Sequence, residues 1–396
     1  MSETKLRIGY IPLVDAAALL VAADHGFAAA EGLAMELVRE VSWSNVRDKL
    51  NIGIFDAAHL LSPMAIASSL GIGHVRVPII APFNLGLNGN AITVSPALYG
   101  ELGALADGDL SSPQVSARAL ARVVAERRAR GGAPLTFGMT FPFSNHNYQL
   151  RFWMAAGGID PDEDVRLVVL PPPYMVESLA SGHVDGFCVG APWNSVAVDS
   201  GVGRILHFGC EIMQRLSEKV LAVRAGWAGD NPAVLARLIR ALAGAAAFVD
   251  RAGNREIVAN IVAQRLDVAA DLVARTLAGS LKIAPDGTTR ARDRYIMIGG
   301  GGANRPDPVQ AAWLYAQIAR WGQAPLSDEL CAAAQSVFRP DLYDAAVGSG
   351  QPSHAGGPDD GIGAFVGPNF VPEDIAGHLT AWRIKRSGRP LLSIVR

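Results

Sequence analysis

The chain has 396 residues; half of them are hydrophobic, 18 % are charged, and the formal net charge is −2. That length suits two α/β lobes with additions better than one ordinary domain. The near-neutral charge balance argues against direct nucleic-acid binding and against a membrane-surface protein. We see no apolar run as long as the roughly 18 residues of a membrane span, and therefore expect no membrane contact.

The start of the chain leads directly into a strand pattern at Ile8–Pro12. It shows no basic region, long apolar segment or cleavage site of an export signal, so we expect a cytoplasmic protein. The three cysteines, Cys188, Cys210 and Cys331, are odd in number and lack CxxC spacing. They fit reduced core thiols better than disulfides or a zinc site.

Strand and helix patterns alternate through the first 95 residues, which implies parallel strand pairing and a sheet covered by helices. The polar, glycine-rich stretch Asn84–Asn90 predicts a turn, and residues 96–113 read as a loop. We expect strands at 5–12, 33–41, 54–60, 76–81 and 91–95, and helices at 15–23, 42–50 and 63–70.

The stretch from Leu135 to Gly158 is the most informative part of the chain. An apolar strand at 135–139 precedes the polar residues Ser144-Asn-His-Asn147, and an apolar helix follows from about Tyr148 until Gly157. A strand, polar turn and helix in this order direct free backbone N–H groups at an anion. The same residues equally suit simple capping of the helix.

The pattern of alternating elements continues to about residue 224 and then gives way to helices. Further strands are expected at 165–170, 184–189, 203–208 and 220–224. The later helices are amphipathic and predicted to wrap an outer surface; they are expected at 231–250, 254–265, 268–280, 307–321 and 327–337. Residues 349–372 predict a mobile linker, and 372–382 a short helix before a basic end.

Four hydrogen-bond donors are predicted at loops, helix starts or strand ends: Trp43, Asn90, His146 and Lys219. Ligands of α/β sheets bind at such positions, and this donor set suits a small oxyanion. Each residue also has a structural interpretation: a packing aromatic, a turn former, a helix cap and a solvated lysine. Motifs of the GxSxG, HExxH and Walker type are missing, and we identify no pair of neighbouring carboxylates, so we expect no enzyme.

Longer stretches resemble the nitrate- and bicarbonate-binding proteins of the NrtA and CmpA kind over roughly residues 5 to 345. The resemblance implies an α/β, two-lobe type II periplasmic-binding-protein fold with helical C-terminal additions. Lobe 1 would comprise 1–92 plus 195–345, lobe 2 would comprise 93–194, and 346–396 would form a linker and tail. The matching stretches are Gly9–Asp15, Ser42–Asp48, Asp56–Met64, Ser144–Asn147, Arg151–Pro161, Pro171–Val176, Phe187–Asn194, Glu218-Lys219 and Arg320–Gly322.

The resemblance places the nitrate ligands of the family at Trp43, His146 and Lys219. Asn90 stands where the family has a glutamine, and Ala191 replaces a glutamate of the family. The acidic, calcium-linked arrangement of the bicarbonate relatives is not found, which favours nitrate or nitrite as ligand, without cofactor or metal. The single positive charge of Lys219 would balance one monoanion.

Together with the expected cytoplasmic location, the chain resembles NasS-type nitrate sensors of nitrate assimilation. The resemblance implies a NasT-type RNA-binding antiterminator as partner, released when nitrate or nitrite binds. The tail beyond residue 372 is a candidate partner contact, or else a disordered end. Alternatives are an exported nitrate-binding component of an ABC transporter whose leader is missing here, and an enzyme on the same clamp fold, as in pyrimidine-synthase relatives with a pyridoxal cofactor.

Overall fold

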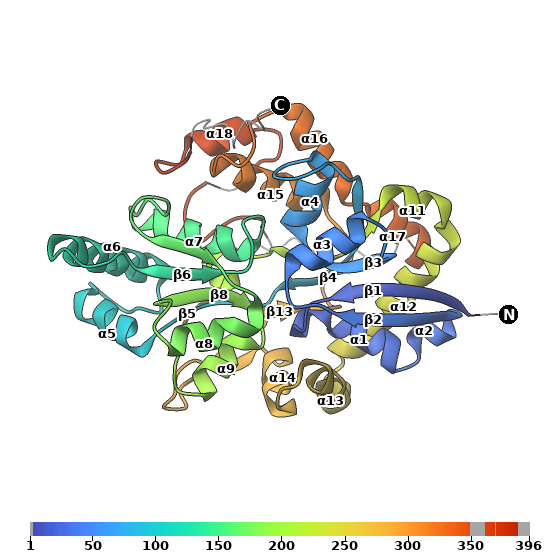
Figure 1. Cartoon of the computed structure of the whole chain (residues 1–396), viewed down its shortest axis with the longest axis horizontal. Coiled ribbons are helices and arrows are strands. Elements are labelled where there is room, and N and C mark those ends of the chain that lie inside the picture. Colours follow the sequence, from blue (N-terminus) through green and yellow to red (C-terminus); the bar gives the residue numbers. More distant parts are fainter. Residues whose placement is uncertain (1–2, 349–360, 369, 387–396) are drawn as a thin grey trace.

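The computed structural model describes residues 3–348, 361–368 and 370–386 of the chain. Its strands form two large sheets side by side and one small hairpin (Figure 1). The first sheet has the order β13-β4-β10-β3-β1-β2, with β1 Thr4–Tyr10, β2 Leu33–Arg39, β3 Ala57–Leu61, β4 Ile79–Asn88, β10 Ser217–Arg224 and β13 Ile296–Met297. The second has the order β7-β6-β8-β5-β9, with β5 Asn90–Val94, β6 Thr136–Met139, β7 Arg166–Val169, β8 Gly186–Gly190 and β9 Arg204–Phe208. The hairpin joins β11 Ser280–Lys282 to β12 Thr289–Ala291.

Both large sheets are mixed, so the expected parallel pairing is confirmed for some strand pairs and wrong for others. β1 lies parallel to β2 and β3, whereas β10 runs antiparallel to β3 and β4. β5 is likewise antiparallel to β8 and β9. The reason is that the chain changes sheets twice: it passes from β4 to β5 through Asn88 and Gly89, both with positive φ, and returns after β9. We call the part built on the first sheet the first lobe and the part built on the second sheet the second lobe.

The second sheet runs from Asn90 to Phe208, whereas the predicted lobe 2 ran from 93 to 194. β9 is the main difference, because this strand pairs with β5 beyond the predicted end of the lobe. The α/β fold class is confirmed, while the lobe boundaries themselves stay a prediction.

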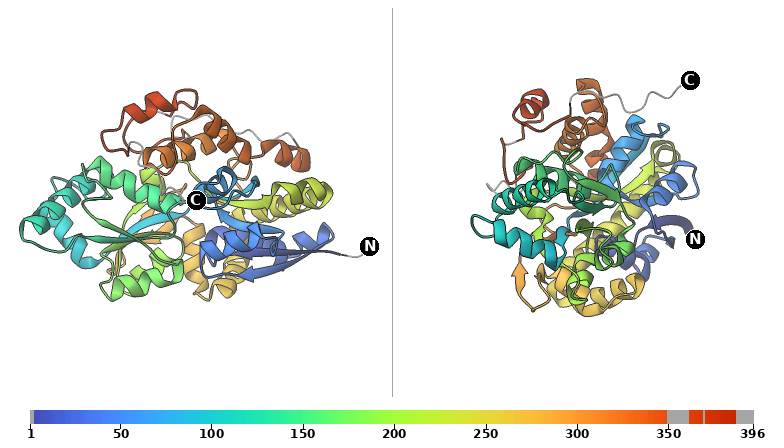
Figure 2. Two further views of the ribbon diagram at one scale, coloured as in Figure 1. Left: turned by 45° about the horizontal axis from the view of Figure 1, so that its top comes forward. Right: turned by 60° about the vertical axis from the view of Figure 1, so that its left-hand side comes forward.

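Helices cover the two sheets (Figures 1 and 2). In the first lobe, strand β3 (Ala57–Leu61) is entirely buried, and helix α1 is buried except for its last two residues. The short helices and 3-10 turns are η1 Val14–Ala16, α2 Phe27–Ala30, η2 Pro172–Tyr174, α8 Met175–Ala180, α9 Trp193–Asp199, α10 Gly209–Ile212, α11 Ala225–Asp230 and η3 Ala252–Asn254. The longer helices are α1 Ala17–Asp24, α3 Trp43–Asn51, α4 Ser62–Leu70, α5 Pro96–Leu105, α6 Pro113–Ala129, α7 Asn145–Ala156, α12 Pro232–Asp250, α13 Arg255–Leu266 and α14 Ala270–Leu277.

Two local predictions are corrected in the region of the first crossing. The polar stretch 84–88 is the end of β4 and not a turn, because Asn84 and Asn88 donate their amides to backbone carbonyls, including those of Ala303 and Arg294. The predicted loop at 96–113 contains helix α5, which Ser95 caps by accepting the Leu98 N–H.

Among the described residues, α12 is long and apolar enough to cross a membrane by length and composition alone. The expectation from the sequence concerned an uninterrupted apolar run, and α12 carries Arg237 and Arg240. In the fold, α12 packs against α1 and α17 and buries Leu238 and Leu242, which is the placement of a core helix.

The C-terminal helices α15 Pro308–Arg320, α16 Asp328–Val337, α17 Pro340–Val347 and α18 Ile375–Thr380 lie along one side of the molecule (Figure 2). Helix α15 is buried beneath α4, α16 and α18 instead of lying on an outer surface. Residues 349–360 of the predicted linker lie outside the described residues. The expected short helix exists as α18, and it buries Ile375 and Leu379.

The C-terminal segment (residues 361–368 and 370–386) contacts both lobes, and its first part corrects the prediction of a mobile linker, because Phe365 N–H donates to the Ile212 carbonyl. The backbone carbonyl of Phe365 accepts from the Gln114 side chain, and Arg386 pairs with Asp160 and Asp162; these partners lie on the second lobe. The Trp382 ring lies 4.3 Å from the Arg320 guanidinium of α15. These described residues of the tail are thus docked instead of forming a disordered end.

Candidate functional site

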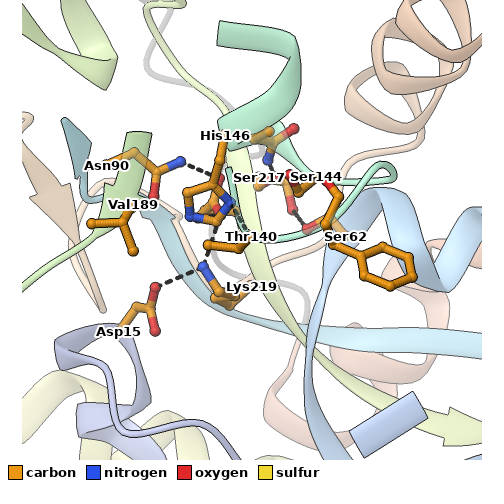
Figure 3. Close-up of polar contacts among 12 residues, drawn as sticks. Asp15, Ser62, Asn90, Thr140, Ser144, His146, Val189, Ser217 and Lys219 are labelled. Atoms are coloured by element: carbon orange, nitrogen blue, oxygen red, sulfur yellow. Dashed lines mark hydrogen bonds and ion pairs between the residues drawn. The ribbon is translucent and has the colours of Figure 1, made fainter. Parts of the chain in front are cut away.

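The structure brings the four predicted site residues together between the lobes, and all four are buried. Figure 3 shows Asn90, His146 and Lys219, and the Trp43 ring lies 5.3 Å from Lys219 Nζ. Trp43 begins α3, and Lys219 lies in β10, both in the first lobe. Asn90 begins β5, and His146 lies in the first turn of α7, both in the second lobe. Asn90 and Lys219 therefore sit within strands, not in a turn and at a strand opening as predicted.

The start of α7 explains the position of His146. Ser144 Oγ accepts the N–H of Asn147, so the helix begins at Asn145, three residues earlier than predicted. This places His146 in the first turn, where Thr140 Oγ1 lies 2.9 Å from its Nδ1. The other ring nitrogen is thereby directed towards the first lobe.

The ammonium of Lys219 contacts two carboxylates. Its Nζ lies 2.9 Å from Asp15 Oδ2 and 2.7 Å from Glu218 Oε1. Adjacent residues of a regular strand point to opposite faces, but the pairing of β10 with β4 shifts register on both sides of Lys219. Such a bulge re-aims side chains, which lets Glu218 and Lys219 meet.

The carboxylate of Glu218 also contacts the second lobe. Asn90 Nδ2 donates to Glu218 Oε2 at 2.8 Å, and His146 Nε2 lies 3.5 Å from Oε1. A single carboxylate of the first lobe therefore faces the ammonium of Lys219, an amide and an imidazole.

Burial and charge pairing set the protonation of this cluster. Burial opposes ionisation of Asp15, but the Lys219 ammonium and the His59 hydrogen bond lower its pKa to about 2. Burial likewise opposes the charge of Lys219, and Asp15 and Glu218 nevertheless raise its pKa. Burial lowers the pKa of His59, and it lowers that of His146 to about 4, so both rings are neutral at pH 7.

The carboxyl groups of Asp15 and Glu218 both face the one ammonium of Lys219. This corrects two expectations from the sequence: a pair of neighbouring carboxylates does exist, and Lys219 is not an uncompensated charge awaiting a monoanion. Asp15 and Glu218 are 1 % and 0 % exposed, so water does not screen either side chain.

Gln149 is a further site residue that the sequence reasoning missed. It lies three residues after His146 on α7, a spacing that puts two side chains on one helix face and could have indicated it. Its Oε1 accepts from Asn90 Nδ2 at 3.1 Å. Its Nε2, together with Trp43 Nε1 and His146 Nε2, is buried without a hydrogen-bond partner. Buried donors of this kind are usually satisfied, so these three mark where a ligand's acceptors would be placed.

The site can recognise an anion through neutral hydrogen-bond donors that surround the Lys219 ammonium and its two carboxylate partners. Cys188 lies nearby, with its Sγ 3.5 Å from Gln149 Oε1, and burial raises the pKa of its thiol well above the usual value, which opposes formation of a thiolate. Among the described residues, no group of three or more His, Cys, Asp or Glu side chains is arranged to hold a metal ion.

Comparisons with known proteins agree with this architecture. A family model described as the NMT1-like family matches residues 1–263. The chain is 30 % identical to the nitrate/nitrite binding protein NrtA of Nostoc sp. PCC 7120 over 397 residues, covering 98 % of this chain and 87 % of NrtA. It is 31 % identical to the nitrate import ATP-binding protein NrtC of Synechocystis sp. PCC 6803, covering 98 % of this chain but only 56 % of that longer relative.

A solved structure supports the same assignment. The periplasmic nitrate-binding protein NrtA from Synechocystis PCC 6803 superimposes with a TM-score of 0.86 at 27 % identity, covering 96 % of this chain and 99 % of NrtA. The predicted two-lobe periplasmic-binding-protein fold and the resemblance to NrtA are thereby confirmed. The chain is a member of the NMT1-like family.

Proposed function

We propose that the chain binds nitrate or nitrite between its two lobes and is a binding protein, not an enzyme. The observation that carries the proposal is the group of donors around Glu218: Lys219 and Asn90 already hold one planar oxyanion, the carboxylate. Trp43 Nε1 and Gln149 Nε2 are further buried donors without a partner, and the Trp43 ring lies 5.3 Å from Lys219 Nζ. The name and structure of NrtA support nitrate as the oxyanion.

The buried position of the site supports a mechanism of opening and closing. Trp43, Asn90, His146 and Lys219 are at most 1 % exposed, so an anion can enter only after the lobes separate. Closure then brings donors from both lobes onto the ligand, which excludes water and strengthens each hydrogen bond.

Isothermal titration calorimetry tests the proposal, with nitrate and nitrite as ligands and bicarbonate, sulfate and chloride for comparison. We expect micromolar dissociation constants for nitrate or nitrite, equivalent to about 8 kcal/mol. Binding of sulfate or bicarbonate without nitrate or nitrite would contradict the assignment.

For the biological role, we propose a cytoplasmic sensor that releases a NasT-type antiterminator when the anion binds. The support is that the ligand set is divided between two lobes, so occupancy and lobe arrangement are coupled. Linkage then requires that nitrate and partner weaken each other's binding by the same factor. Partner affinity should fall at least fivefold in nitrate, measured by surface plasmon resonance; equal affinity with and without nitrate would reject the role.

The alternative role is a binding component that delivers the anion to an ABC transporter. The names of the relatives, a nitrate/nitrite binding protein and a nitrate import ATP-binding protein, favour it. Cell fractionation separates the two roles, because a sensor would be found with the cytosol and a delivery component with the envelope fraction.

A further inference from the structure

We infer that the Glu218 carboxylate occupies the anion position of the ligand-free site, bridges the two lobes there, and competes with the incoming oxyanion. The inference rests on the proposed function and deepens it, because it names the group that the ligand must displace.

The contacts of Glu218 are those that a bound oxyanion would make. A carboxylate is planar and carries one negative charge shared by its oxygens, as nitrate and nitrite do. Oε1 accepts a hydrogen bond from the Lys219 ammonium at 2.7 Å, and Oε2 accepts one from the Asn90 amide at 2.8 Å. The His146 Nε2 stands 3.5 Å from Oε1, too far for a good hydrogen bond, and remains partnerless. The carboxylate thus satisfies part of the donor set and leaves the rest unmatched.

Charge gives the second reason. Asp15 and Glu218 already share the one ammonium of Lys219, while His59 and His146 are neutral. A further monoanion beside these groups would find the ammonium already paired, in a fully buried place where uncompensated charges are costly. The incoming anion therefore needs the donors that Glu218 holds, and Glu218 must withdraw from Lys219 and Asn90.

Topology gives the third reason. Glu218 belongs to β10 of the first lobe, whereas Asn90 and His146 belong to β5 and α7 of the second. The carboxylate therefore links the lobes without any ligand. Asp15 touches the same ammonium, but its other hydrogen bond goes to His59 of β3, within the first lobe. Both carboxylates contact the Lys219 ammonium, but of the two it is Glu218 that also contacts the second lobe.

This difference supplies a matched pair of variants. Glu218→Gln keeps the shape and a hydrogen-bond acceptor for Lys219 while removing the charge. Asp15→Asn removes the same charge from the same ammonium within one lobe. We expect nitrate to bind Glu218→Gln at least tenfold more tightly than wild type in calorimetry, and Asp15→Asn to gain much less. Equal gains would assign the effect to net charge alone and overturn the competition; a weaker Glu218→Gln would also overturn it.

Small-angle X-ray scattering of the ligand-free proteins gives a second readout that does not require nitrate binding. Glu218→Ala should have a larger radius of gyration than wild type, because the bridge between the lobes is lost, while Asp15→Asn should not. If nitrate and nitrite fail to bind any variant, the proposed function falls, and equal radii would then overturn the bridge as well. If all variants bind nitrate equally and have equal radii, the proposed function stands and the role of Glu218 is rejected.

Discussion

The two halves of the site are built from different chemistry. The first lobe supplies the charges, Asp15, Glu218 and Lys219, which pair with one another inside that lobe. The second lobe supplies neutral donors, mainly Asn90 and His146. The pairing of Lys219 with Asp15 therefore persists whether the lobes are open or closed, whereas the contacts of the neutral donors with the first lobe form only on closure. This division predicts that substitutions in the first lobe change stability and affinity together, and that substitutions in the second lobe act mainly through closure.

The largest effect is expected for Lys219→Ala. Removing the ammonium leaves two buried carboxylates without their cation, and breaking a buried ion pair costs about 3–5 kcal/mol of unfolding free energy. Nitrate binding should also be lost, because the donor with a formal charge is gone. Urea unfolding and calorimetry measure the two effects. The matched control is Lys49→Ala, whose partly exposed ion pair with Glu40 should be worth at most about 1 kcal/mol.

The next effect is a pH dependence that arises in the second lobe. Unfolded His146 titrates near 6.5, but burial lowers its pKa to about 4 in the folded protein. Below pH 6.5, His146 binds a proton in the unfolded chain but not in the folded protein. The free energy of unfolding therefore falls by up to about 3 kcal/mol as the pH drops towards 4. His146→Gln should flatten this slope in urea unfolding at several pH values. Buried His207, whose pKa is also lowered, remains as background in both proteins.

Asn90→Ala tests a contact between the lobes that is made by a neutral donor. The amide donates to a carboxylate at 2.8 Å, and hydrogen bonds to charged groups contribute about 2 kcal/mol. We expect a loss of that size in unfolding free energy. A useful control is Asn254→Ala, whose amide donates to the carbonyl of Phe248 away from the site. Equal losses in both variants would show that the interlobe contact has no special weight.

Trp43→Phe is expected to have the smallest effect on affinity. The indole Nε1 is buried without a partner, but the ring itself is fully buried, so the smaller phenyl ring should cost about 1–2 kcal/mol of unfolding free energy through the space it leaves. Nitrate affinity should drop about fivefold, as for the loss of one hydrogen bond of about 1 kcal/mol. An unchanged affinity in calorimetry would remove Trp43 from the ligand set.

The sequence was sufficient for most elements but not for the pairing of the strands. Alternating strand and helix patterns identified β1, β2 and β3 because each is a local run of apolar residues. The antiparallel insertion of β10 depends on where the chain crosses between sheets, which no local pattern records. Asn84 and Asn88 were misread as turn residues because their partners lie far along the chain.

The same limit applies to the site. Trp43 and His146 were found because capping residues mark helix starts, and helix starts in α/β folds face ligands. The sequence indicates Glu218 only through the matching pair Glu218-Lys219, because on a regular strand its side chain would point away from that of Lys219. The irregular pairing of β10 with β4 turns the Glu218 side chain towards the site. Asp15 was missed because it contacts Lys219 from a distance of about 200 positions along the chain.

The docked C-terminal segment has a mechanical consequence. Two backbone crossings near residues 89 and 210 define a line about which the lobes can rotate. Contacts of Arg386 with Asp160 and of Phe365 with Gln114 attach the tail to the second lobe, while Trp382 contacts Arg320 of α15 as well as Phe152 of α7. The tail adds to other contacts between the lobes, such as that of Arg320 with Phe152, in limiting the amplitude of rotation. A rotation wide enough to admit an anion would strain or break the contacts of the tail. Release of the tail and separation of the lobes are therefore coupled.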